Sequence, residues 1–224
     1  MQHKVNQGTR DGAAVYSPLV LKAYDLWVLG FSNRYAWQCP TRSVLLPFFQ
    51  QHLSANHLDV GVGTGYYLAH SSFSAKQKIA LLDLNRNSLA AASAPIAHLL
   101  PLLIQEDILN PNGALGNQKF DSISLFYLLH CLPGNIREKA AQAFELLHQH
   151  LTVGGTLYGA TILGDHVAHN WLGRRLMRLY NKKGIFGNHD DTLSDLESAL
   201  TRYFTKVNVR QHGKVALFSA ELAN

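Results

Sequence analysis

The sequence predicts an α/β fold with a mostly parallel sheet, which an antiparallel hairpin closes at the C-terminus. Three observations lead to this prediction. Short β-rich segments alternate with helical segments over residues 58–162, a glycine-rich turn follows the first of them, and two further β-rich segments are separated only by His212-Gly213-Lys214. Alternating strands and helices imply crossover connections and helices on both faces of the sheet. Two strands joined by a short turn form a hairpin.

Length and composition fit a single cytoplasmic domain. The chain has 224 residues, of which 47% are hydrophobic and 10% aromatic, enough for one sizeable core. No run approaches the roughly 20 apolar residues of a membrane span, and the polar start MQHKVNQGTRDG lacks the apolar middle of a signal peptide. The two cysteines, Cys39 and Cys131, do not suggest a disulfide framework, so we expect a reducing cytoplasm. The sequence predicts no particular oligomeric state.

The charge pattern permits nucleic-acid binding without arguing for it. The net charge is +5 and the isoelectric point about 9.2, with a basic cluster on the helical stretch 174–183. A solvated helix face is the commoner explanation of such a cluster. The chain has twelve histidines but no HExxH or CxxC pattern, and its close histidine pairs lack a third ligand at useful spacing. We therefore expect no metal site and consider nucleic acid an unlikely partner.

We expect one domain over residues 1–224, in which residues 1–55 form an N-terminal helical cap and residues 56–224 the α/β core. Residues 1–16 are polar and carry no periodicity. A helix is expected from Pro18, interrupted at Gly30 and the Phe31-Ser32-Asn33 step, and a second over Thr41–His52. Both helices precede the first strand, so they are expected to cover the glycine turn.

The core elements follow from periodicity and turn signals. The expected strands are Leu58–Val60, Ile79–Asp83, Leu102–Gln105, Ser122–Phe126 and Thr156–Ile162, and then the hairpin strands Phe204–Gln211 and Val215–Ala220. The clearest helices between them are Asn87–His98 and Ile136–His150.

The glycine turn lies in the stretch LDVGVGTGYYL, residues 58–68. Closely spaced glycines let the backbone turn sharply and let a ligand approach it without Cβ atoms in the way. A strand, a glycine turn and a helix start make a common small-molecule cradle in open α/β sheets. The dinucleotide fingerprint G-x-G-x-x-G is not met, because its third glycine falls on Tyr66. A βα turn without a ligand is the alternative that this stretch alone leaves open.

The segment Asp-Val-Gly-Val-Gly-Thr-Gly resembles the first motif of class I S-adenosyl-L-methionine (SAM)-dependent methyltransferases. The resemblance implies a Rossmann-like class I methyltransferase fold with SAM as cofactor and S-adenosylhomocysteine as product. It also implies that the methionine part of the cofactor lies against Asp59, Gly61, Gly63, Thr64 and Gly65.

Acidic residues at the next strand ends support this interpretation. Strand two ends in Asp83, and strand three is followed by Glu106 and Asp107. Ligands of open parallel sheets bind beyond the carboxyl ends of the strands, and a carboxylate there can accept bonds from both ribose hydroxyls. By resemblance Asp83 meets the ribose, Asp107 the adenine amino group, and Ile108 packs on the ring. Further cofactor contacts are expected from Leu84, Phe126 and Tyr127.

The resemblance extends through FDSISLFYLLHCLPG (120–134) and LTVGGTLYGATIL (151–163), and so covers roughly residues 58–163. After strand four, methyltransferases that act on the amino groups of nucleic-acid bases carry a D/N-P-P-Y/F motif. Phe126-Tyr127-Leu128-Leu129 stands there instead. A small organic acceptor is therefore the stronger expectation.

His130, in the segment after strand four, is the candidate catalytic residue, because an imidazole can accept a proton near neutral pH. A base and a positioning role both remain open for it. Candidate acceptor-binding residues are Tyr24 and Trp27 in the aromatic cap and His166 and Asn170 after strand five.

The sequence thus predicts a SAM-dependent methyltransferase that acts on a small organic acceptor. Two alternatives keep the cofactor: a SAM-binding protein that does not transfer methyl groups, and an RNA methyltransferase. The RNA alternative requires the basic helix 174–183 to face the cofactor opening. A third alternative is a binding module without activity, against which the three strand-end acids argue.

Overall fold

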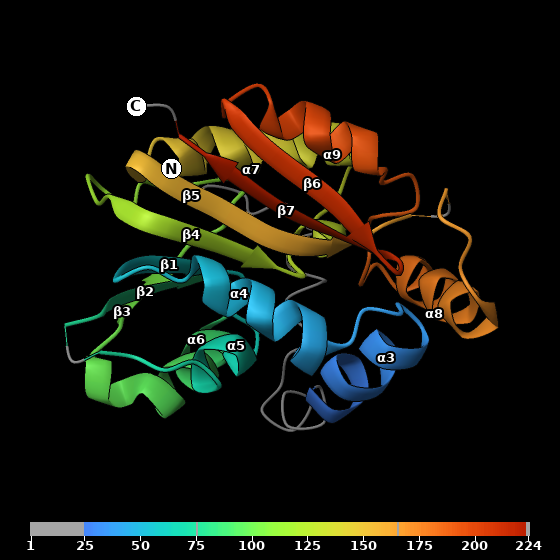
Figure 1. Ribbon diagram of the computed structural model, residues 1–224, viewed down its shortest axis with the longest axis horizontal. Helices are drawn as coiled ribbons and strands as arrows, with labels where there is room; N and C mark the ends of the chain where they lie inside the picture. Colours follow the sequence, from blue (N-terminus) through green and yellow to red (C-terminus); the bar gives the residue numbers. More distant parts are fainter. Residues whose placement is uncertain (1–24, 75, 165, 223–224) are drawn as a thin grey trace.

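The computed structural model describes residues 25–222 except 75 and 165, with side chains from residue 29 onward. Its centre is one seven-stranded sheet in the order β3-β2-β1-β4-β5-β7-β6 (Figure 1). The strands are β1 (Asn56–Val60), β2 (Lys78–Asp83), β3 (Leu102–Gln105), β4 (Phe120–Phe126), β5 (Leu151–Ile162), β6 (Lys206–His212) and β7 (Val215–Glu221).

The pairing of the strands confirms the predicted fold class. Strands β1 to β5 run parallel, and β7 inserts antiparallel between β5 and β6. The strand order reverses between β2-β1 and β4, so the carboxyl end of β1 lies at the point where an open sheet offers a crevice for a ligand.

Helices cover both faces of the sheet, and each face has its own apolar core. The helices α7 (Ile136–His148) and α9 (Leu193–Leu200) pack on one face, against the side chains of Leu58, Ile123 and Phe218. On the other face lie α4 (Leu46–His52), α5 (Tyr66–Ala69), α6 (Arg86–Ser93) and α8 (Trp171–Lys182). Figure 1 shows α8 beside the N-terminal helices, at the end of the sheet where β6 and β7 turn.

The N-terminal segment differs in part from the prediction. A π-helical segment η1 (Asp25–Ser32) continues without a break through Gly30 into α3 (Asn33–Tyr35), whereas an interruption was expected there. The Asn33 amide donates to the Thr41 hydroxyl, and the Thr41 hydroxyl donates to the carbonyl of Leu29. These hydrogen bonds connect η1 and α3 to Thr41 of the next segment. They stabilise the helical conformation through Gly30, where local sequence signals favour the end of a helix. The part of this helix that was expected from Pro18 to residue 24 lies outside the described residues.

The second predicted helix is confirmed as η2 (Thr41–Leu45) followed by α4. Phe48 and Phe49 of α4 are buried against Phe126 and Tyr158 of the sheet. α4 therefore packs on the sheet face and contributes no residue to the cavity described below, whereas both helices were expected to cover the glycine turn. η1 reaches that cavity through Leu29.

Other elements also differ from the prediction, most clearly α6, β5 and α9. α6 ends at Ser93 and a 3₁₀ segment η3 (Ala94–Leu99) follows, because Pro95 interrupts the helix. β5 begins at Leu151 and carries Gly154-Gly155 inside it, where its pairing with β4 shifts register. α9 was not predicted; its start has a local signal, since the Thr192 hydroxyl accepts from the backbone N–H of Asp195. Within the described residues no helix has the length and apolar character of a membrane span.

Candidate active site

The three glycines of the turn between β1 and α5 share a backbone conformation but differ in their surroundings. All have a positive φ, +73° at Gly61, +54° at Gly63 and +73° at Gly65, a region that L-residues with side chains rarely adopt. A Cβ on Gly61 would lie 2.9 Å from the Leu128 side chain, and one on Gly65 would lie 2.5 Å from the Ala92 backbone. A Cβ on Gly63 would meet no atom within 4 Å. Gly63 alone therefore presents bare backbone to open space.

Beside this turn a cavity opens at the carboxyl edge of the sheet. Because β1, β2 and β3 are parallel, their ends meet at this edge, and Asp59, Asp83 and Asp107 all line the cavity. The three strand-end acids that the sequence singled out thus lie in one site.

Asp83 stands against the glycine turn. Its carboxylate accepts the N–H of Asn85 at 2.8 Å, and N–H groups of Val62 and Gly63 also stabilise its charge. Burial outweighs these bonds and raises the pKa of Asp83 to about 6. At neutral pH the carboxylate is charged in an apolar setting and can accept bonds from a ligand's hydroxyl groups.

Asp59 ends the central strand and forms the floor of the cavity. It is buried, and one carboxylate oxygen accepts the Ser124 hydroxyl at 2.5 Å. Burial raises its pKa to about 7, and the nearby Asp83 charge adds to the rise. A positively charged ligand group above Asp59 would favour its ionised form.

After β3 the chain forms a turn that presents two acids. Asp107 accepts the N–H of Leu109 at 3.0 Å, so its carboxylate is fixed at the cavity wall. Oε1 of Glu106 accepts the N–H of Asn112 at 2.6 Å, while its buried Oε2 has no hydrogen-bond partner among the described residues. Glu106 was noted in the sequence but given no role. The turn after β3 places it in the cavity lining.

Ten of the eleven predicted cofactor residues line this cavity. They are Asp59, Gly61, Gly63, Thr64, Asp83, Leu84, Asp107, Ile108, Phe126 and Tyr127. Gly65 does not line it, since it packs on Ala92 of α6. Sequence reasoning did not assign the other lining residues, among them Leu29, Val62, Tyr66, Tyr67, Ser88, Leu128, Cys131 and Leu132. For Tyr66 and Tyr67 a signal was present, because aromatic residues directly follow the glycine motif.

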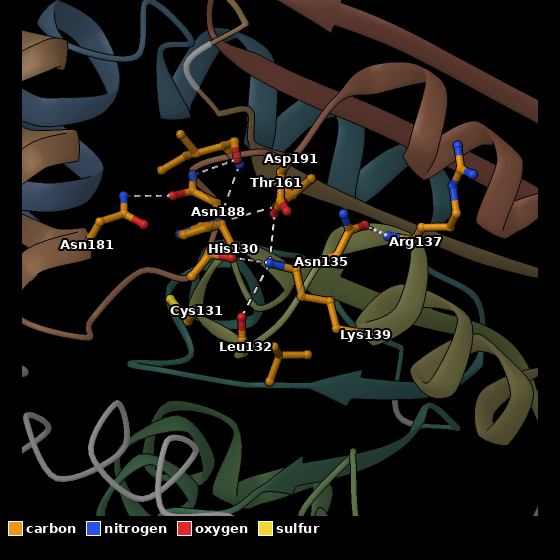
Figure 2. A network of polar contacts seen from close by, with 12 residues as sticks. His130, Cys131, Leu132, Asn135, Arg137, Lys139, Thr161, Asn181, Asn188 and Asp191 are labelled. Atoms are coloured by element: carbon orange, nitrogen blue, oxygen red, sulfur yellow. Dashed lines mark hydrogen bonds and ion pairs between the residues drawn. The ribbon is translucent and has the colours of Figure 1, made fainter.

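His130 lies outside the cavity lining, in the network of Figure 2. It is 2% exposed, and its Nδ1 accepts the backbone N–H of Ile162 at 3.3 Å. Its ring packs edge-on against Phe186 and Tyr127. Burial, helped by the charge of Lys139, lowers the pKa of His130 to about 3. This imidazole is neutral at physiological pH, and its geometry favours positioning over proton transfer.

The same network contains a buried ion pair (Figure 2). The Lys139 ammonium lies 2.8 Å from Asp191 and also donates to the carbonyls of Gly187 and Leu132 at 2.7 and 3.3 Å. Asn188 donates to the carbonyl of Ile162 at 3.0 Å. These contacts fix the loop 184–192 beside the segment that carries His130.

Two of the four predicted acceptor residues, His166 and Asn170, do not lie at the cavity. His166 is exposed in a turn, and Asn170 caps α8 while its amide donates to the carbonyl of Tyr35 at 2.6 Å. Neither lines the cavity, because the chain after β5 turns away toward α8. Tyr24 lies outside the described residues, as does the side chain of Trp27.

The basic helix α8 lines a different pocket. Arg174 and Arg178 of α8 line a second pocket with His169 and His189, and no residue of α8 lines the cofactor-side cavity. The condition set by the RNA alternative is thus not met within the described residues. In this part of the chain, too, no three His, Cys, Asp or Glu side chains gather as metal ligands would.

The cavity fits the cofactor that the sequence implies. It offers bare backbone at Gly63, fixed carboxylates at the end of β2 and just after β3, and an ionisable carboxyl at its floor. SAM carries a ribose diol, an adenine amino group and a positively charged methionine part, which are complementary to these groups.

Comparison with known proteins also indicates a methyltransferase. A family model for a methyltransferase domain matches residues 58–157. The chain is 50% identical over 193 residues to the protein YbcY of Escherichia coli (strain K12), covering 86% of this chain and 98% of the other. It is 40% identical over 212 residues to the physcion biosynthesis cluster O-methyltransferase of Aspergillus chevalieri, covering 95% of each.

A solved structure supports the fold. The DhpI–SAH complex superposes with a TM-score of 0.65 at 14% identity, over 98% of this chain and 99% of the other. Its ligand is S-adenosylhomocysteine, the product form of SAM. With the site and the curated relatives in agreement, the chain belongs to the class I SAM-dependent methyltransferases and transfers a methyl group to a small organic acceptor.

Proposed function

We propose that this methyltransferase acts on a hydroxyl oxygen of a small, flat and largely apolar acceptor. The observation that carries the proposal is a single cavity in which the strand-end carboxylates face an aromatic and apolar wall. That wall is made of Leu29, Tyr66, Tyr67, Tyr127, Leu128 and Leu132. Aromatic side chains favour flat ligands. A relative that covers 95% of this chain is named an O-methyltransferase, which supports oxygen as the acceptor atom.

For the cofactor we propose one role per strand end. Asp83 accepts bonds from the ribose hydroxyls, Asp107 and Ile108 hold the adenine, and the turn from Gly61 to Gly65 receives the methionine part with Asp59 beneath it. When bound, SAM supplies an electrophilic methyl group for in-line displacement. The protein then contributes mainly position and exclusion of water.

The acceptor's proton is the second requirement of oxygen methylation. No imidazole or amine of the described residues lines the cavity, and burial raises the pKa of the Cys131 thiol to about 12. We therefore infer an acceptor with an acidic hydroxyl, such as a phenol, which gives up its proton without a strong base. His130 acts in this proposal through position: its Nδ1 holds Ile162, and its ring supports Tyr127 of the cavity wall.

The chain as a whole works in this proposal as one domain, with residues 1–55 as a cap over the core of residues 56–224. Leu29 supports the cap role, because it lines the cavity from the N-terminal side. Bound cofactor is therefore expected to slow amide hydrogen exchange over residues 29–37. Cys39 and Cys131 are free thiols, which suits a reducing cytoplasm as the site of action. Cell fractionation with an antibody checks that placement.

The direct test uses methyl-labelled SAM with three matched acceptor sets: phenols, aliphatic alcohols and amines of similar size. Mass spectrometry of the products should find O-methyl phenols, one S-adenosylhomocysteine per product, and no label on the other two sets. The Asp83→Ala variant serves as a control that should transfer little label. N-methyl or C-methyl products, or label incorporated into added RNA, would contradict the proposal.

A further inference from the structure

A chain of polar side chains runs through the apolar core beneath Asp59. Ser54 lies 2.7 Å from Ser122 between hydroxyl oxygens, and Ser122 lies 2.8 Å from Nδ1 of His57. Nε2 of His57 lies 3.1 Å from the Ser124 hydroxyl, which contacts Asp59 at 2.5 Å. His57, Ser122 and Ser124 are at most 1% exposed, whereas Ser54 is half-buried. Four hydrogen bonds thus connect the cavity floor to the other end of the strands.

Strand register creates this chain. β1 and β4 are parallel neighbours, with His57 paired to Ser122 and Asp59 to Ser124. Because side chains alternate along a strand, all four residues point to the same face. The rings of Phe49 and Tyr158 pack against His57, with centroids 5.7 and 6.0 Å away. Polar groups in so apolar a setting must satisfy one another.

The donor directions in the chain depend on the charge of Asp59. An ionised Asp59 can only accept, so the Ser124 hydroxyl donates to it and the Ser124 oxygen is left to accept from Nε2–H of His57. A neutral imidazole carries one proton. Nδ1 must then accept, and the Ser122 hydroxyl donates to it.

Asp59 protonated on the oxygen that contacts Ser124 reverses every step. Its O–H donates to the Ser124 oxygen, the Ser124 hydroxyl donates to Nε2, and Nδ1–H of His57 donates to Ser122. The two arrangements differ by the movement of one proton across each hydrogen bond. Going from the protonated to the ionised form, Asp59 passes its proton to Ser124, each following member accepts one proton and passes one on, and Ser54 releases one proton to solvent, so one proton is lost in total. Only O–H and N–H bonds break and form, so no oxidant or reductant is needed.

We infer that His57 and Ser124 are positioning residues that couple the ionisation of Asp59 to the tautomer of His57 and deliver the released proton at Ser54. This inference rests on the proposed place of the cofactor's methionine part above Asp59. The α-ammonium group of that part, which SAM and S-adenosylhomocysteine share, favours the ionised carboxylate, while the ligand covers the cavity side of Asp59. The chain of hydroxyls and imidazole gives the proton a route on the opposite side.

The titratable groups that surround the hydrogen-bonded side chains from Ser54 to Asp59 are consistent with this coupling. Burial, with a smaller contribution from the charge of Asp83 on β2, raises the pKa of Asp59 to about 7, so it changes charge near neutral pH. Burial lowers the pKa of His57 to about 3, so His57 can change its tautomer but does not hold a second proton. Tyr158 on β5 faces Asp59, and burial raises its pKa well above 10, so it stays neutral. From α4, His52 stacks on Tyr158 with ring centroids 5.1 Å apart.

The tautomer of His57 is the direct readout, and it needs neither cofactor nor variant. In ¹⁵N-histidine-labelled wild-type protein, two-bond ¹H–¹⁵N spectra distinguish Nδ1–H from Nε2–H. We expect Nδ1–H at pH 5.5 and Nε2–H at pH 8.5, and saturation with S-adenosylhomocysteine at pH 6.5 should give Nε2–H. One tautomer across this pH range in the cofactor-free protein would overturn the coupling. A His57 tautomer that changes with pH but not with the ligand would support the coupling of His57 to Asp59. It would contradict the placement of the cofactor's methionine part above Asp59.

Calorimetry tests the positioning role. In buffers of different ionisation enthalpy, wild type at pH 7 should release about half a proton per S-adenosylhomocysteine bound, because half of Asp59 is protonated. Ser124→Ala removes a bond to the charged form. If the pH midpoint of Asp59 ionisation rises by about one unit, the dissociation constant of S-adenosylhomocysteine at pH 7 rises about fivefold. The dissociation constants of variant and wild type then converge near pH 8.5. Ser124→Thr should restore the profile.

His148→Gln is a control outside this set of polar side chains, since His148 on α7 is hydrogen-bonded to the carbonyl of Phe144 and its ring lies beside Tyr203. It should reproduce the wild-type pH profile. A Ser124→Ala variant with the wild-type midpoint, or with a weaker affinity that does not recover at high pH, would assign Ser124 to packing alone and overturn the inference.

Discussion

The ammonium group of Lys139 lies 2.8 Å from the carboxylate of Asp191, and both side chains are 1% exposed. Removing one partner of such a pair leaves the other charge buried without compensation, at a cost of about 3–5 kcal/mol. We expect Lys139→Met to lower the free energy of unfolding by this amount in urea denaturation. The exposed pair Lys206–Glu221 offers the control, because Lys206→Met should cost less than about 1 kcal/mol.

The double variant Lys139→Met/Asp191→Leu separates charge from packing. Replacing both ions by apolar groups of similar size is often near neutral. The double variant should therefore recover most of the stability that Lys139→Met loses. If it is no more stable than the single variant, the carbonyl contacts of Lys139 are what hold the loop 184–192 in place.

Asp83 should control cofactor affinity and its dependence on pH. Asp83→Asn keeps the size and removes the charge, so SAM binding should weaken by about 1.5–3 kcal/mol, roughly ten- to hundredfold. In wild type, affinity should fall further as the pH drops through about 6, below the fall near pH 7 that belongs to Asp59, since the pKa of Asp83 is raised to that value and the ionised form binds. Titration calorimetry from pH 5 to 8 measures both effects. Asp121→Asn, an exposed acid at the other end of β4, should change neither.

Gly63 offers a test of the open cradle. In Gly63→Val the side chain would enter open space beside the cavity, so SAM binding should be lost. Gly116 is a matched control, because its φ of +53° is close to the +54° of Gly63 and a Cβ there also meets nothing within 4 Å, outside the cavity. Both valines carry a similar backbone strain of about 1–2 kcal/mol. Only the Gly63 variant should lose the cofactor in equilibrium binding; equal losses would mean that strain, not space, decides.

His130 should act through its acceptor nitrogen and its packing. His130→Gln keeps an acceptor for the N–H of Ile162, so turnover should stay within a few-fold of wild type. His130→Ala leaves that buried N–H without a partner and should lower the free energy of unfolding by about 1–3 kcal/mol. A general base would instead contribute about 10²–10⁴ in rate. A loss of turnover of that size in a stable His130→Gln variant, measured by product formation, would show that His130 acts as the general base.

Much of the cavity lining could be predicted because its signals are local. The glycine pattern specifies a turn from its own backbone requirements, and Asp83 and Asp107 each follow a recognisable strand. Parallel strands end at one edge of a sheet, so placing each acid at a strand end already placed the acids together. The acceptor residues His166 and Asn170 had no such constraint. The chain after β5 bends toward α8, and nothing in the local sequence fixes that direction.

The sequence by itself determined the alternation of strands and helices, the glycine turn and the strand-end acids, because backbone conformation and periodicity act over a few residues. Only the tertiary structure decided that His130 is buried beneath the loop 184–192 and that His57 connects two serines to Asp59. Those contacts join residues 31 or more positions apart, and a register shift of one residue would turn the side chains of β4 to the other face of the sheet. The physical cause is long-range strand register and burial, which no local pattern encodes.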